Sequence, residues 1–112
     1  MQKEVQMTDG VLSERERAFE AVFAQQEAMR FRTVARRNRM LAAWAAGLIG
    51  RDDIDVYASE VIAADFSRAG DADVLRKLMR DFESAGVGID EETVQMKMHA
   101  FMQAASQQME NI

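Results

Sequence analysis

The stretch RFRTVARRNRMLAAWAAGLIG, residues 30–50, decides the fold because it combines strong helix formers with a defined end. A basic first part leads into an apolar run, and the apolar residues recur at spacings of three and four. Gly47 and Gly50 follow, and glycine commonly ends a helix. We therefore expect a long helix whose inner stripe consists of Phe31, Val34, Ala35, Leu41, Trp44, Ala45 and Leu48.

This helix is predicted to extend upstream as far as Ser13. Ser13 and Glu16 have the spacing of a capping box, in which two side chains satisfy backbone N–H groups at a helix start. Polar and charged residues then interrupt the apolar face, after a single apolar turn made by Phe19, Val22 and Phe23. Because an isolated helix is marginal in water, residues before about Met29 are expected to be frayed or loosely docked. The alternative is that the two phenylalanines fold back onto the edge of the domain.

Three shorter helices are expected downstream, each begun by an aspartate and followed by a turn. Aspartate accepts hydrogen bonds from the N–H groups of a first helical turn, and glycine readily adopts the backbone conformation that ends a helix. The expected N-caps are Asp52 or Asp53, Asp71 and Asp90, and the expected ends are Ala69-Gly70 and the Gly86-Val87-Gly88 turn.

Apolar residues at helical spacing give each of these helices one face to bury. The predicted faces are Ile54, Tyr57, Ala58, Val61 and Ile62, then Leu75, Leu78, Met79 and Phe82, then Val94, Met98, Phe101, Met102, Ala105 and Met109. Proline is absent and no strand-like alternation occurs, so the predicted class is all-α. Short connections predict a compact four-helix bundle with a long first helix and a flexible N-terminal arm. The arm is assigned to residues 1–20 and the four-helix domain to residues 21–112.

Length and composition bound the class of protein. The 112 residues suffice for one domain, and the absence of cysteine removes disulfides and thiolate metal sites, which fits the cytoplasm. No apolar run reaches the roughly 18 residues of a spanning helix, so the chain is not expected to be membrane-embedded. The net charge of −5 is unlike the basic balance of duplex-binding domains, so no nucleic-acid partner is expected. We expect a monomer when the chain is free.

Charge is distributed unevenly along the chain. Residues 14–51 carry eight basic and four acidic side chains, whereas residues 52–112 carry five basic and thirteen acidic ones. Mutual attraction within the fold explains this arrangement without any ligand. Asp65 lies near the apolar face of the second helix, where an unpaired carboxylate is costly. We expect its partner to be an arginine of the first helix or Arg76.

The basic run offers one candidate binding site, made of Arg36, Arg37 and Arg39. Guanidinium groups match phosphate oxygens, so these residues are candidates for a nucleotide or another anion. The alternative is that they are solvated or paired within the chain. Charge alone supports the anion site.

Other side-chain chemistry is sparse. His99 has no cysteine and no second histidine to complete a transition-metal site, so no metal is expected and His99 is interpreted as a surface or edge residue. The Gly86-Val87-Gly88 stretch lacks the preceding strand of a dinucleotide site and is interpreted as a turn. No nucleophile, base and orienting group can be assembled, so the chain is not expected to be an enzyme.

Several motifs in order resemble one family. They are RERAFE at residues 15–20, Phe23, ARRNR at residues 35–39, LAAWAAGLIG at residues 41–50, ADF at residues 64–66 and AGDADVLRKL at residues 69–78. Together they resemble the zeta-subunit family of bacterial ATPase inhibitors over roughly residues 14–110. Family members commonly carry a Phe-Asp-Asp turn ahead of the first motif, whereas this chain reads Asp9-Gly10-Val11-Leu12-Ser13 there.

The resemblance implies a four-helix protein that binds the catalytic head of an F-type ATP synthase and blocks ATP hydrolysis through its N-terminal segment. The implied partners are the alpha, beta and central-stalk subunits, and the implied location is the cytoplasm, peripheral to the inner membrane when bound. It also suggests weak adenine-nucleotide binding, without fixing residues for it. The inhibitory arm maps onto Arg15, Glu16, Arg17, Ala18, Phe19 and Glu20, with the apolar turn adding Val22 and Phe23.

Two alternative functions stay open at this point. One is a helical module that binds a nucleotide or another anion through the arginines. The other is a family member that binds the synthase without inhibiting it.

Overall fold

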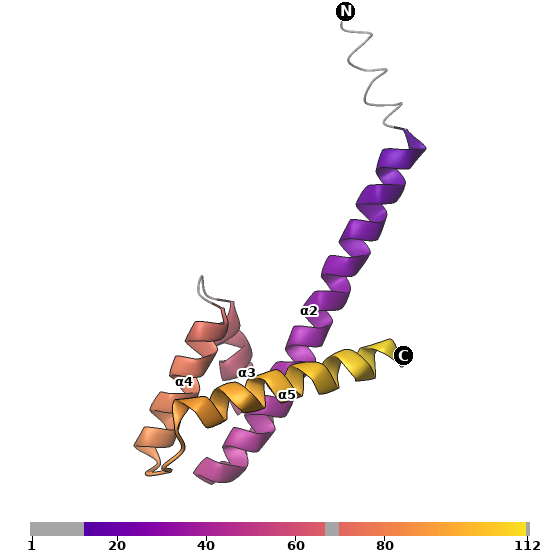
Figure 1. Ribbon diagram of the computed structural model, residues 1–112. Helices are drawn as coiled ribbons and strands as arrows, with labels where there is room; N and C mark the ends of the chain where they lie inside the picture. Colours follow the sequence, from indigo (N-terminus) through magenta and orange to yellow (C-terminus); the bar gives the residue numbers. More distant parts are fainter. Residues whose placement is uncertain (1–12, 67–69, 112) are drawn as a thin grey trace, which may run out of the picture. The chain divides into compact units, whose positions relative to one another are not determined.

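The computed structural model describes residues 13–66 and 70–111, and the regular structure in these ranges is helical (Figure 1). The helices are α2 (Glu14–Ile49), α3 (Ile54–Asp65), α4 (Asp71–Ser84) and α5 (Glu91–Glu110). Helix α2 is 36 residues long and α5, the next longest, is 20. The predicted all-α class and the long first helix are confirmed.

The chain divides into two compact units, and the division falls inside α2, between Phe31 and Arg32. The later unit contains the C-terminal part of α2 together with α3, α4 and α5, and it is the predicted compact bundle. The boundary expected from the sequence was residue 20. Residues 14–20 are helical, while residues 1–12 lie outside the described part of the chain. That the arm is flexible before it meets a partner stays a prediction.

Glycine ends two of the helices in the way the sequence predicts. Gly50 has a φ of 81°, and the Arg51 N–H that follows donates to the Ala46 carbonyl over 2.9 Å. Gly86 has a φ of 72°, and the Val87 N–H donates to the Phe82 carbonyl over 2.8 Å. Both are Schellman motifs, which need the left-handed conformation that glycine adopts without a steric penalty. They turn the chain so that successive helices can pack.

The predicted helix starts are confirmed in position at Asp90 and Asp53, and the predicted start at Asp71 is not. The Asp90 carboxylate accepts from the Thr93 N–H over 2.9 Å, as an N-cap does. Asp53 occupies the N-cap position of α3, but its carboxylate binds Arg51 instead of the helix. The prediction that Asp71 caps α4 is wrong by one residue, because Gly70 is the N-cap and the Asp71 carboxylate is held by Arg37.

The end of α3 was also predicted too late. The helix ends at Asp65, with Phe66 as its C-cap, instead of at Ala69-Gly70. Residues 67–69 lie outside the described part of the chain.

The core is formed by one face of each helix in the later unit. Tyr57 and Phe82 are its largest apolar members, and Trp44 packs edge-on against Phe82 with ring centroids 5.5 Å apart. The buried apolar residues are Leu41, Ala42, Ala45, Ala46, Tyr57, Ala58, Val61, Val74, Leu78, Phe82, Val94, Met98 and Ala105. The downstream faces are therefore largely as predicted, although Ile54 is exposed and Val74, which was not predicted, is buried.

The predicted stripe of α2 is wrong at both ends. Phe31 and Leu48 are exposed, while the buried positions are Thr33, Arg37, Asn38, Leu41, Ala42, Ala45 and Ala46. These positions repeat at i and i+4, so the spacing is that of one helix face. The spacing of apolar residues does not predict this buried face, because the residues in its first two turns are polar. Arg37 and Asn38 hydrogen-bond each other, and each also contacts a carboxylate of another helix, which compensates their burial.

Candidate protein-binding site

The N-terminal half of α2 carries an exposed apolar turn. Phe19 is 72% exposed and Phe23 is 58% exposed, and Val22 beside them is exposed as well. At 100° per residue the three side chains lie within an arc of about 100°, so they share one side of the helix. Large apolar side chains grouped on a surface mark a binding site more often than scattered ones do.

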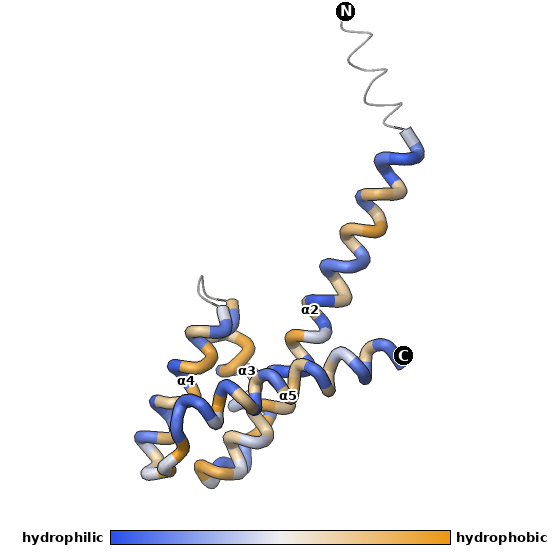
Figure 2. Tube along the Cα trace, in the orientation of Figure 1, coloured by the Kyte–Doolittle hydropathy of each residue, from blue (hydrophilic) through white to orange (hydrophobic). Residues whose placement is uncertain are grey.

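Charged residues surround this turn. Figure 2 shows hydrophobic and hydrophilic stretches alternating along the N-terminal half of α2. Arg15, Glu16, Arg17, Ala18 and Glu20 are all exposed, as are the residues from Ala24 to Phe31. The helix begins where the Ser13 carbonyl accepts from the Arg17 N–H over 3.1 Å. The candidate inhibitory residues therefore lie in one continuous helical segment, with the apolar turn at its C-terminal end.

Two of the arginines proposed to bind an anion, Arg36 and Arg39, instead contact side chains of other helices in the bundle. Arg36 donates from Nη1 to the Gln108 side chain of α5 over 2.9 Å. Arg39 reaches Asp55 of α3 at 3.4 Å, and both of these side chains are mostly exposed. The pairing alternative is thus realised at these positions. Weak adenine-nucleotide binding stays a prediction.

Arg37 differs from its neighbours because it is 1% exposed. Its Nη2 lies 2.9 Å from Asp71 and 3.8 Å from Asp65, and its Nε donates to the Asn38 side chain over 2.8 Å. Asn38 in turn donates to Asp65 over 3.1 Å. The expectation that an arginine of the first helix pairs with Asp65 is confirmed, while Arg76 pairs with Asp73 instead. This partly buried network joins α2 to the end of α3 and the start of α4.

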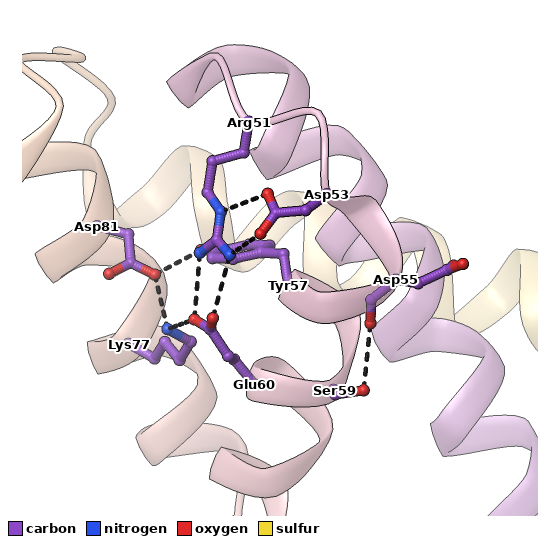
Figure 3. Close-up of polar contacts among 8 residues, drawn as sticks. All are labelled: Arg51, Asp53, Asp55, Tyr57, Ser59, Glu60, Lys77 and Asp81. Atoms are coloured by element: carbon purple, nitrogen blue, oxygen red, sulfur yellow. Dashed lines mark hydrogen bonds and ion pairs between the residues drawn. The ribbon is translucent and has the colours of Figure 1, made fainter.

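A second polar cluster, around Arg51 and Tyr57, was not predicted (Figure 3). The Arg51 guanidinium lies 4.8 Å from the centroid of the Tyr57 ring and binds Asp53 and Glu60. The Tyr57 hydroxyl donates to Asp81 over 2.6 Å. Lys77 donates to both Glu60 and Asp81 over 2.9 Å, and so completes the Arg51–Tyr57 cluster. In the sequence, the only sign of this cluster is that basic and acidic residues alternate in the α2–α3 turn and along α4.

The contacts in the Arg51–Tyr57 cluster shift several pKa values. Hydrogen bonds from Lys77 and Arg51 lower the pKa of Glu60. Burial opposes ionisation of Asp81, yet the hydrogen bonds from Tyr57 and Lys77 outweigh it and lower its pKa. Burial and then the Asp81 contact raise the pKa of Tyr57 above its ordinary value. All members of the cluster keep their ordinary charge at neutral pH. The cluster is therefore better suited to holding α3 against α4 than to acid–base chemistry.

The described residues contain neither a candidate metal site nor a helix that could span a membrane. No group of three or more histidine, cysteine, aspartate or glutamate side chains within residues 13–66 and 70–111 is placed to hold a metal ion. In the same ranges no helix has the length and apolar character needed to cross a membrane. His99 is exposed on α5, as expected for a surface residue.

The described residues form a helical protein whose exposed apolar turn is a candidate protein-binding site. A sequence model of the family described as ATPase inhibitor subunit zeta matches residues 7–108. The chain belongs to this family, which confirms the resemblance seen in its motifs. The family's description is that of a regulatory inhibitor subunit, not of a catalyst. No curated protein sequence matches the chain in a similarity search.

Proposed function

We propose that the chain inhibits ATP hydrolysis by an F-type ATP synthase, and that it does so by inserting the N-terminal half of α2 between subunits of the catalytic head. The alpha, beta and central-stalk subunits are the contacts, and the bound protein lies peripheral to the membrane. Family membership supports the ATPase as the target. The exposed apolar turn of Phe19, Val22 and Phe23 is the observation that carries the insertion.

The free energy gained by burying the apolar turn can be compared with the free energy that binding to a partner requires. Full burial of each side chain contributes about 1.5–3 kcal/mol, so the three together contribute roughly 5–9 kcal/mol. Micromolar affinity needs about 8 kcal/mol after the costs of association are subtracted. The apolar turn supplies much of this but not all. The charged residues Arg15 and Arg17 on the same segment supply further contacts.

The segment binds as a helix, so the cost of ordering it matters for the affinity. A segment that folds only on binding loses part of its interaction energy to ordering. Residues 14–31 lie in one helix of the structure, and this loss is reduced to the extent that they keep that helix before binding. The inserted helix acts as a wedge that prevents the catalytic subunits from closing, and closing is what hydrolysis requires.

The test is an ATP hydrolysis assay on the isolated catalytic head. Full-length protein is expected to lower the rate, and protein lacking residues 1–20 is expected to bind weakly and leave the rate unchanged. A truncated protein that inhibits as well as the full chain would contradict the assignment of the arm. A full-length protein that binds the head without changing the rate would show a family member that does not inhibit.

A photo-crosslinking residue placed at Phe23 locates the contact directly. The proposal expects crosslinks to the catalytic-head subunits, and the same residue placed at Glu83, exposed on α4, serves as the matched control. Equal crosslinking from both positions would remove the support for insertion of this segment.

A further inference from the structure

The bundle has a hollow that neither the core nor the inhibitory segment uses. It is open, has a volume of about 520 Å³, and is lined by the first turn of α4, by Arg37 and by α5. Leu75, Met98 and Met102 give it an apolar floor, with Met98 buried and the other two half-buried. Methionine side chains adapt to different occupants because they are unbranched and flexible. We call this hollow the α4–α5 groove.

The rim of the α4–α5 groove is acidic. Glu91 is exposed at the first residue of α5, and the Asp71 side chain is 67% exposed although it also contacts Arg37. Arg37 offsets only one of these two carboxylates, the Asp71 carboxylate that it binds, so the Arg37, Asp71 and Glu91 side chains of the lining sum to −1. An anionic ligand would meet two carboxylates and an arginine that is already occupied. The charge of the groove therefore favours a cation.

The length of the α4–α5 groove fits a helical peptide. Its lining runs along α5 from Glu91 to Met102, which at 1.5 Å per residue is about 16 Å, or three helical turns. A groove with an apolar floor and a charged rim is the typical receptor for an amphipathic helix. Arginine and lysine suit such a rim because their aliphatic stems cover apolar surface while their charged ends stay at the edge.

We propose that the α4–α5 groove binds a basic amphipathic helix of a partner protein. The apolar residues of that helix, spaced three and four apart, pack on Leu75, Met98 and Met102. A flanking arginine or lysine pairs with Glu91, and another pairs with Asp71. Gln95 and His99 line the same side and can hydrogen-bond to polar groups of the partner. The groove does not include the inhibitory segment, so this proposal can be tested independently of inhibition.

The probe for this proposal is a fluorescent helical peptide of about 14 residues, with leucines spaced three and four apart and arginines flanking them. It is titrated into the full-length chain while fluorescence anisotropy and backbone amide shifts are recorded. We expect a Kd below about 100 μM, with the shifted amides at the first turn of α4 and along residues 91–102 of α5. A peptide of the same composition in scrambled order should bind at least about tenfold more weakly.

Two charge reversals in one helical turn give a matched comparison. Glu91→Lys should weaken peptide binding at least about tenfold, because it places like charges together. Glu92→Lys makes the same change at an exposed neighbour that does not line the groove, and should alter binding by less than about twofold. Circular dichroism confirms that both variants are folded. Equal effects of the two variants, equal binding of the scrambled peptide, or amide shifts away from α4 and α5 would each overturn the proposal.

Discussion

The two halves of α2 differ in which kinds of side chain they bury. In the N-terminal half the apolar residues Phe19 and Phe23 are exposed, whereas in the C-terminal half even Arg37 and Asn38 are buried. Side-chain polarity would predict the reverse. The difference shows that burial in this helix is decided by the partners available. Arg37 and Asn38 contact carboxylates on α3 and α4, while Phe19 and Phe23 remain exposed.

The largest expected effect is on stability in the buried half. Leu41→Ala should lower the free energy of unfolding by about 2–5 kcal/mol, because Leu41 is fully buried and its removal leaves a cavity. Phe19→Ala removes more apolar surface but should change stability by less than about 0.5 kcal/mol, because Phe19 is exposed. Urea unfolding followed by Trp44 fluorescence measures both. Equal losses in the two variants would mean that the halves do not differ.

Arg37 and Arg39 allow the same comparison between a buried and an exposed side chain of α2. Arg37→Met should cost about 2–4 kcal/mol of unfolding free energy, since it leaves Asp65 and Asn38 without their buried cation. Arg39→Met, whose pair with Asp55 is exposed, should cost less than about 0.5 kcal/mol. The measurement is again urea unfolding. A large loss for Arg39→Met together with a small one for Arg37→Met would overturn the assignment of burial.

A smaller effect is expected from acid. The pKa values of Glu60 and Asp81 are lower in the folded chain than in the unfolded one, where they are about 4. Their contribution to stability is therefore complete above that pH and is lost as the pH falls through the lower, folded values. Asp81→Asn should cost about 1 kcal/mol at pH 6 and much less at pH 3. A cost that does not change between these two pH values would contradict the role of the Arg51–Tyr57 cluster.

The sequence predicted those features that depend on local rules. The Asp90 cap and the glycine turns at Gly50 and Gly86 follow from residue type and spacing within a few positions. The exposed apolar turn of α2 was also visible, because its stripe is interrupted a turn later. These features need no knowledge of what lies across the core.

What the sequence did not predict depends on contacts between distant residues. The buried face of α2 was misplaced because the charge of the buried Arg37 is compensated by carboxylates far along the chain. Asp71 was assigned to its own helix start, yet Arg37 attracts its carboxylate away. Leu75 and Met102 were assigned to the core, but they remain half-buried and line the α4–α5 groove. Apolar spacing alone cannot separate a core position from the floor of a groove.

The most direct test of the central claim compares two phenylalanines of the same helix. Phe19→Ala removes a member of the apolar turn, whereas Phe31→Ala removes an exposed phenylalanine outside it. ATP hydrolysis by the isolated catalytic head is measured against increasing concentrations of each variant. The account predicts that Phe19→Ala raises the half-inhibitory concentration by at least about tenfold, which corresponds to about 1.4 kcal/mol, while Phe31→Ala changes it by less than about threefold. Inhibition by Phe19→Ala at the concentrations that suffice for the parent chain would contradict it.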